Sequence, residues 1–344
     1  MKRFLSAVLL FFLSAGQFLF SQATAIDKVQ FFKDTSVINA TMVANFGKII
    51  SQKYKIGNQY PGTFAFKVND SIYIKEPILI VVRGHSRKDI CYIPPLKLNF
   101  DYKPQSFLYP LKSLKLVSAC KVTDENDQYL LKEYMVYKIY NILTDKSFNA
   151  RLLNLHYEDS SGRKKTFAEH AFLLESTKEM AKRNNCIEWT KGNPKTEQTD
   201  RRQMTIVAIF EYMIGNTDWG VSVSHNTRLI QAKDDSTSRP FAVPYDFDYS
   251  GLVNTDYSIP AEALGTESVL QRVYRGFPRT QAEINEVLQI FIQQKENIYA
   301  AINQFSLFTR NSKKEITYYL DSFFDMIKDP AEVKSIFIDN ARTQ

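Results

Sequence analysis

The chain has 344 residues, of which 44% are hydrophobic and 24% are charged, and its formal net charge is +7 at pH 7. This charge is mild and is spread along the chain rather than gathered in blocks, so the sequence does not indicate a nucleic-acid-binding protein. The chain contains 12 Gly and no low-complexity tract, so we expect a packed globule rather than a disordered or fibrous protein.

The first 25 residues have the pattern of a secretory signal peptide. Two basic residues precede an apolar stretch from Phe4 to Phe20, and Ala23-Thr24-Ala25 then offers the small residues of a cleavage site. An uncleaved anchor is the alternative, although the stretch is slightly short for a membrane-spanning helix. We therefore predict cleavage before Ile26 and an exported chain, periplasmic or extracellular, whose mature form has no transmembrane segment.

The residues after this leader have a β-rich pattern. An amphipathic helix is expected at residues 34–53, where apolar side chains recur at helical spacing behind possible capping residues. Apolar runs bounded by turn residues then predict strands, which in chain order cover residues 62–68, 71–82, 96–100, 114–118, 150–157 and 165–174. A second helix is expected at residues 129–143, between the fourth and fifth of these strands.

Three cysteines in an exported chain leave at least one thiol unpaired. Cys91 and Cys120 fall on predicted strands, and they can form a disulfide only if those strands are neighbours, which the sequence leaves open. The cysteine spacing is not that of a CxxC metal site, and the four scattered histidines form no HExxH pattern. A transition-metal enzyme is therefore not expected.

From residue 176 onward the pattern becomes mainly helical. Apolar residues recur at helical spacing in four segments, which are residues 177–184, 200–214, 280–305 and 312–328. Strands with one long helix come first and helices follow, which is the order of an α+β protein with two lobes. We predict a two-lobed, atypical protein-kinase-like fold, with a β-rich N-lobe and its N-terminal extension at residues 26–175 and a helical C-lobe at residues 176–344.

Residues 213–251 carry the most informative pattern of the chain. After Asn226, an apolar-leaning run, a polar cluster and the run Phe241–Tyr245 together predict a β-hairpin. Folding this hairpin about its midpoint sets Asn226 beside Asp246, and amide and carboxylate oxygens are ligands that Mg²⁺ accepts. Asp218 lies just upstream, where its carboxylate can take the proton of an attacking hydroxyl. The alternative is that Asp, Asn and Gly gather here only because turns favour them.

Four sequence strings lie in order within residues 76–255: RGHSRKDICYIPPLKLNF, LKLVSACKVTDENDQYLLKEYMVYKIYNILTDKSFNARLL, FLLES and YDFDYSGLVN. In this order they resemble the spore coat protein H (CotH) kinase-like family, in its signal-peptide-bearing Gram-negative branch. The resemblance implies an atypical protein-kinase fold that binds ATP with a divalent metal ion, Mg²⁺ or Mn²⁺. It also implies an activity, because members of the family phosphorylate secreted proteins on serine.

The resemblance implies roles for individual residues of the hairpin region. Asp218 would be the catalytic base, Asn226 a metal ligand, and Asp246 the metal-binding acid that matches the first residue of a DFG motif. Seven residues separate Asp218 from Asn226, instead of the four of ordinary protein kinases, so Asn216 is the fallback for the amide ligand. Asp248 is a candidate second metal ligand, and capping of the next turn is its alternative role.

Phosphoryl transfer also needs a lysine that a helix glutamate holds in place. Glu133, on the predicted helix 129–143, is the candidate glutamate. Two lysines compete as its partner, because Lys115 lies on the strand just before that helix and Lys97 matches a lysine of the CotH pattern. We predict an ion pair between Lys115 and Glu133. The alternative is that both lysines are solvated residues of exposed strands.

Two further predictions concern the nucleotide. Arg83 and Arg87 flank Gly84 in a short basic loop, which is expected to fold over the triphosphate in place of a glycine-rich loop. A surface turn is the alternative for this loop. Glu175 falls where the two predicted lobes join, near the expected edge of the adenine.

These observations favour an exported phosphotransferase that uses a nucleoside triphosphate and a divalent metal ion to modify a Ser or Thr hydroxyl or an envelope component. Its expected partners are the nucleotide and a secreted or envelope protein substrate, with no nucleic acid. The alternative is a non-catalytic relative that serves as a scaffold or envelope assembly protein. A serine hydrolase is disfavoured, because the sequence contains no GxSxG motif.

Overall fold

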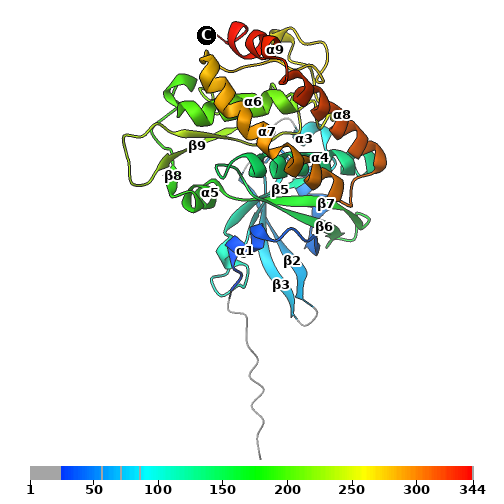
Figure 1. The fold of residues 1–344 in the computed structure, drawn as a ribbon. Helices are drawn as coiled ribbons and strands as arrows, with labels where there is room; N and C mark the ends of the chain where they lie inside the picture. Colours follow the sequence, from blue (N-terminus) through cyan, green and yellow to red (C-terminus); the bar gives the residue numbers. More distant parts are fainter. Residues whose placement is uncertain (1–24, 56, 70–71, 85–86, 343–344) are drawn as a thin grey trace, which may run out of the picture.

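Seven strands form a closed barrel within residues 25–55, 57–69, 72–84 and 87–342, which this computed structural model describes (Figure 1). The strands follow the order β1-β2-β3-β4-β5-β7-β6, and β1 pairs in parallel with β6 to close the barrel. Their bounds are β1 (Ile38–Ala44), β2 (Gln59–Asn69), β3 (Ile72–Val82), β4 (Leu96–Asn99), β5 (Ser113–Ser118), β6 (Ala150–Asp159) and β7 (Phe167–Leu174). The predicted signal peptide, apart from Ala25, lies outside the described residues.

The predicted two-lobed kinase-like fold is wrong, since the described chain forms a closed barrel with helices and a small separate sheet. The cause lies in residues 34–53, where the predicted helix is replaced by strand β1 and the short helix α2 (Phe46–Ser51). Side chains of β1 are buried at every second position, and the strand has partners on both edges, β2 and β6. Pairing with strands distant in sequence thus overrides the helical spacing of its apolar residues.

The longer helices gather on one side of the barrel, which lies below them in Figure 1. The longest helix beside the barrel, α4 (Asp124–Leu143), begins after Thr123 and packs against β6 and β7. The other helices and the small sheet are α1 (Lys28–Lys33), α3 (Arg87–Ile90), α5 (Thr177–Arg183), α6 (Arg201–Ile214), α7 (Gln281–Gln304), α8 (Arg310–Met326), α9 (Pro330–Lys334), β8 (Cys186–Glu188), β9 (Thr227–Ala232) and β10 (Phe241–Pro244). The four helices predicted after residue 176 are confirmed. In the described part of the chain, no helix is long and apolar enough to cross a membrane.

The side chains of β5 face two separate cores. Leu114 and Leu116 point into the barrel interior with the buried residues of β1 to β4. Val117 and Phe172 of β7 belong to a second core, which α4 and the helical region complete. Because side chains alternate along a strand, Lys115 shares the outer face with Val117. This outer face looks towards the helical region and supplies one wall of the candidate site.

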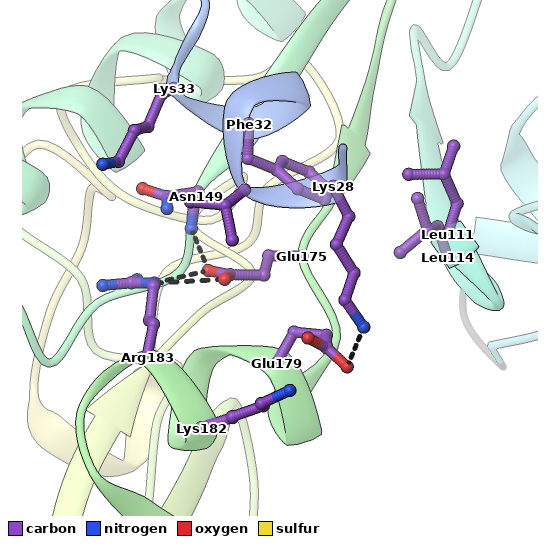
Figure 2. A pocket seen from close by; sticks show the side chains of 11 residues that line it. Lys28, Phe32, Lys33, Leu111, Leu114, Asn149, Glu175, Glu179, Lys182 and Arg183 are labelled. Carbon is purple, nitrogen blue, oxygen red and sulfur yellow. Dashed lines mark hydrogen bonds and ion pairs between the residues drawn. The ribbon is translucent and has the colours of Figure 1, made fainter. Parts of the chain in front are cut away.

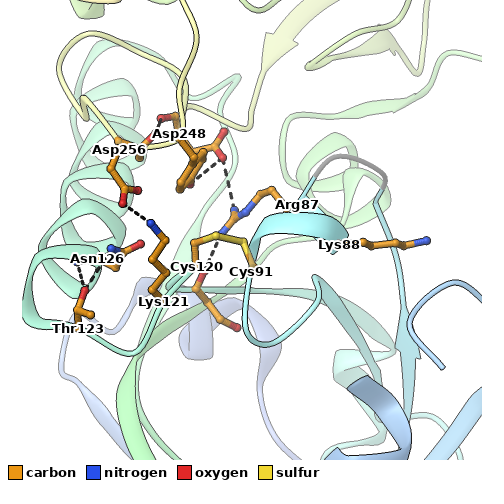
Figure 3. Close-up of a disulfide and its surroundings, with 12 residues drawn as sticks. Arg87, Lys88, Cys91, Cys120, Lys121, Thr123, Asn126, Asp248 and Asp256 are labelled. Atoms are coloured by element: carbon orange, nitrogen blue, oxygen red, sulfur yellow. Dashed lines mark hydrogen bonds and ion pairs between the residues drawn. A yellow bond between two sulfur atoms is a disulfide. The ribbon is translucent and has the colours of Figure 1, made fainter. Parts of the chain in front are cut away.

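A disulfide joins Cys91 to Cys120, with a Cα–Cα distance of 4.3 Å, and so decides the pairing that the sequence left open (Figure 3). Neither cysteine lies on a strand as predicted, since Cys91 follows α3 and Cys120 follows β5. The third cysteine, Cys186, is free and buried. The bridge therefore ties the segment that carries Arg87 to the end of β5.

Removing the disulfide with the double substitution Cys91→Ser and Cys120→Ser is expected to lower the free energy of unfolding. The bridge joins residues 29 positions apart, and a loop of that length corresponds to about 3–4 kcal/mol of lost chain entropy in the unfolded state. Urea unfolding monitored by circular dichroism measures this loss. Reduction of the unaltered protein should reproduce it, and an unchanged urea midpoint in both cases would contradict the prediction.

Candidate functional site

The predicted hairpin is confirmed by strands β9 and β10. Thr227 pairs with Pro244, and the Tyr245 N–H donates to the Asn226 carbonyl at 3.0 Å. Asn226 therefore lies opposite Tyr245, one residue away from the predicted partner Asp246. Asn226 and Asp246 both adopt left-handed backbone conformations, with φ of 47° and 66°. Asn and Asp tolerate this region better than other non-glycine residues, and such conformations are common at functional sites.

Asp218 and Asn226 come together as predicted. The Asn226 side-chain amide donates to the Asp218 carbonyl at 2.8 Å and to its carboxylate at 2.9 Å. The second Asp218 carboxylate oxygen lies 2.6 Å from His225 Nε2, a partner that the sequence analysis missed. Because Asn226 turns its nitrogen towards Asp218, its Oδ1 atom is left without a hydrogen bond to the described residues. Asp218 itself stays open to solvent, with 38% of its side chain exposed.

Asp246 holds a carboxylate that has no hydrogen bond or ion pair within the described chain. Only its backbone N–H is engaged, since it donates to the Tyr137 hydroxyl of α4 at 2.9 Å. Its negative charge favours the charged forms of Arg83 and Lys115, and it adds to burial, the larger cause, in raising the pKa of Asp248. The charge of Asp218 also raises the pKa of Asp248. Asp218 and Asp246 therefore act electrostatically on the same region.

Three basic side chains share the outer face of β3, β4 and β5. Lys97 and Lys115 are cross-strand partners, and Arg83 lies two residues beyond Val81, the partner of Lys97 on β3. The Lys115 amine sits 4.0 Å from the ring centre of Tyr245, the residue before Asp246. Burial, followed by the charge of Arg83, lowers the pKa of Lys115 to about 7. These side chains form a basic wall opposite the hairpin.

The predicted ion pair between Lys115 and Glu133 is wrong. Lys115 reaches across to the Tyr245 ring of the hairpin and does not turn back towards α4. Glu133 is buried, and its Oε1 has no hydrogen-bond partner among the described residues. Burial, followed by the charges of Asp248 and Asp246, raises its pKa well above the usual value.

Arg87 is engaged with protein groups in the structure. Its guanidinium donates to the Ser118 carbonyl at 2.8 Å and lies 3.6 Å from the Asp248 carboxylate (Figure 3). Asp248 also accepts a hydrogen bond from the Tyr257 hydroxyl at 3.0 Å. Burial raises the pKa of Asp248 to about 6. The contacts of Asp248 thus indicate that it holds Arg87 in place. They do not favour its predicted role as a metal ligand.

Glu175 lies apart from this cluster. Its carboxylate accepts from the Asn149 N–H at 3.0 Å, and both of its oxygens lie 3.1 Å from Arg183 Nε. Both oxygens of the carboxylate are therefore bonded to protein groups, so the geometry does not favour the predicted position of Glu175 at an adenine edge.

Two side chains brace the loop that presents Asp218. The buried Asn216 accepts a hydrogen bond from the Asp218 N–H at 3.0 Å, so this fallback metal ligand instead shapes the loop. Arg275 donates to the carbonyls of Thr217 and Trp219 at 2.5 and 2.6 Å. The contact between Asn216 and Asp218 joins residues two positions apart, as in a local Asx turn that the sequence can indicate. Arg275 is more than 50 residues downstream, so no pattern near Asp218 in the sequence predicts this contact.

Glu211, just before this loop, is buried without a hydrogen-bond partner for either carboxylate oxygen in the described structure. Burial raises its pKa to about 8. Between the usual glutamate pKa of 4.5 and this value, the folded state holds a proton that the unfolded state has lost. The contribution of Glu211 to the free energy of unfolding should therefore be fully present below about pH 4.5. It should be lost as the pH rises to about 8, which lowers the free energy of unfolding by roughly 3–5 kcal/mol.

The substitution Glu211→Gln is expected to remove this part of the pH dependence. Urea unfolding at pH 5 and pH 8.5, compared between the two proteins, measures the change. Glu286→Gln, at an exposed glutamate that pairs with Arg202, is the control and should keep the original dependence. An equal pH dependence in Glu211→Gln and the unaltered protein would contradict the assignment.

The free oxygens of the site suit a hard divalent cation. Neither the Asp246 carboxylate nor the Asn226 amide oxygen has a hydrogen-bond partner among the described residues, and Mg²⁺ in phosphoryl-transfer sites uses one or two protein ligands with phosphates and water. Within the described residues, no group of three or more His, Cys, Asp and Glu side chains is placed to hold a metal ion. The site therefore suits a metal ion that is bound together with the phosphates of a nucleotide, rather than an ion held by the protein alone.

No protein-family model matches this chain, and no curated protein matches it either.

Proposed function

We propose that this protein transfers a phosphoryl group from a nucleoside triphosphate, such as ATP, to a hydroxyl group with the help of Mg²⁺ or Mn²⁺. One observation carries the proposal. The Asp246 carboxylate, which has no hydrogen bond or ion pair among the described residues, acts electrostatically on the half-buried basic side chains of Arg83 and Lys115, and the Asn226 amide oxygen is free on the neighbouring strand end. An acid with a purely structural role would be expected to form an ion pair with one of these basic side chains.

Each side chain of the site then has a role. Asp246 and Asn226 Oδ1 would hold the metal ion, which supplies positive charge to the phosphates when bound. Arg83 offers positive charge from the opposite wall, and Lys115, whose pKa is lowered to about 7 by burial and then by the charge of Arg83, becomes fully charged once a triphosphate raises that pKa. Asp218 is exposed and accepts the proton of the attacking hydroxyl, and His225 orients its carboxylate.

The acceptor in this proposal is a Ser or Thr side chain of an exported protein, or another envelope component with a free hydroxyl. Export is supported by the signal-peptide pattern and by the Cys91–Cys120 disulfide, since such bonds persist in oxidising compartments. The resemblance of four sequence strings to the CotH kinase-like family supports the same chemistry. Residues 26–344 would then be the working enzyme in the periplasm or outside the cell.

Nucleotide binding is expected to stabilise the protein only when a divalent ion is present. A ligand at 100 times its dissociation constant stabilises the folded state by about 2.7 kcal/mol. A thermal-shift measurement with ATP and Mg²⁺ or Mn²⁺ tests this, with ATP plus EDTA and the metal ion alone as controls. No shift with any nucleoside triphosphate and either ion would contradict the proposal and favour a scaffold role.

A further inference from the structure

A cavity of about 200 Å³ lies between helices α1 and α5, where β5 begins and β7 ends (Figure 2). Leu114 of β5 lines it and belongs to the barrel interior, whereas the next residue, Lys115, points to the opposite face and to Tyr245. The cavity therefore opens away from the phosphoryl-transfer site and has no part in that proposal.

The walls of this cavity are mainly apolar. Phe32, Leu111 and Leu114 are each less than 10% exposed, and Val29 of α1 stands at the mouth with 51% of its surface exposed. Apolar cavities of about 150 Å³ already bind molecules the size of benzene. The space thus suits the apolar body of a small molecule.

Both carboxylates that line the cavity are already paired. Glu175 is held by Arg183 and by the Asn149 N–H, and Glu179 pairs with Lys28 at 2.6 Å (Figure 2). A cationic ligand would have to displace one of these partners.

Two lysines of the lining remain without an ion pair or side-chain hydrogen bond to any described residue. They are Lys33 at the end of α1 and Lys182 near the end of α5, on the two helices that flank the cavity. With four cationic and two anionic side chains, the lining has a net charge of +2. The uncompensated charge favours an anion at the rim.

We infer that this cavity binds a small molecule with an apolar body and one anionic head group, of the class of medium-chain carboxylates. The apolar body lies against Phe32, Leu111 and Leu114. The carboxylate lies at the rim near Lys182, and Lys33 on the other flanking helix adds to the positive charge that the lining leaves uncompensated. A neutral molecule of the same length gains only the apolar contacts.

Isothermal titration calorimetry of residues 26–344 with decanoate tests this inference, with decanol as the neutral probe of equal length. At low ionic strength, decanoate should bind at a single site with a dissociation constant below about 1 mM. Decanol should bind at least roughly fivefold more weakly, and added salt should weaken decanoate alone.

Two variants test whether decanoate binds in this cavity. Val29→Trp fills the mouth at an exposed position and should abolish decanoate binding. Lys182→Glu should weaken decanoate roughly three- to tenfold, as expected for reversing one partly exposed charge. Lys178→Glu makes the same change at an exposed position of α5 outside the cavity, and it should change the affinity less than about twofold.

The inference is overturned if decanoate fails to bind, or if both Val29→Trp and Lys182→Glu bind it as the unaltered protein does. Equal affinity for decanol would remove the anionic head from the ligand class. Association with phosphatidylglycerol vesicles without uptake of free decanoate would assign the basic rim to a membrane surface and equally overturn the inference. Circular dichroism of each variant confirms that it folds.

Discussion

Replacing Asp246 with Asn is expected to remove the metal dependence of nucleotide binding and leave the fold intact. Only the backbone of Asp246 makes a hydrogen bond in the described structure, so an amide of equal size leaves no partner unsatisfied. With Mg²⁺ present, the affinity for ATP should fall by at least about 100-fold, which corresponds to about 2.7 kcal/mol. Calorimetric titration with ATP in Mg²⁺ and in EDTA measures both affinities.

The metal-free affinity separates loss of a ligand from general damage. In EDTA, Asp246→Asn should bind ATP as well as the unaltered protein or better, because one negative charge facing the triphosphate is gone. Asp234→Asn is the matched control, since Asp234 lies in the exposed turn region at the other end of the same hairpin. Equal Mg²⁺ dependence in Asp246→Asn and the unaltered protein would place the metal ion elsewhere.

The hairpin and its acids could be predicted from the sequence because their signals are local. Asn226, the polar turn and the run before Asp246 lie within about two dozen residues, and turn-forming residues mark the fold-back point. The pairing of Asn226 was displaced by one residue, to Tyr245, because the geometry of the turn sets the register. The contact between Asn226 and Asp218 also follows from this short stretch.

Features that depend on distant partners could not be predicted in the same way. Strand β1 has apolar residues at helical spacing, and only its pairing with β2 and β6 makes it a strand that closes the barrel. Arg275 braces the carbonyls around Asp218 from a loop far downstream. The place of Lys115 before α4 favours an ion pair with Glu133, but its amine lies over the ring of Tyr245. In each case a contact between residues distant in sequence determines which of the locally allowed conformations forms.

Replacing Asp218 with Asn is expected to stop phosphoryl transfer while nucleotide binding persists. A base that accepts the hydroxyl proton contributes about 10²–10⁴-fold to the rate, and it is needed only once an acceptor is present. The affinity for ATP and Mg²⁺ should therefore stay within about twofold of the unaltered value. Transfer from radiolabelled ATP to the protein itself, or to an envelope fraction of its own host, measures the rate.

Asn at this position keeps the shape of the loop, which makes the outcome interpretable. The Asp218 carbonyl still accepts from the Asn226 amide, and the single amide oxygen of the variant can keep one of the two side-chain contacts, either with His225 or with the Asn226 amide. Asp256→Asn, at an acid that pairs with Lys121, serves as the control and should transfer phosphate normally. If Asp218→Asn transferred phosphate at the unaltered rate, the carboxylate would serve only to hold Asn226 and His225 in place. The proton would then have to leave through another group, and a scaffold role would follow only if Asp246→Asn also left nucleotide binding unchanged.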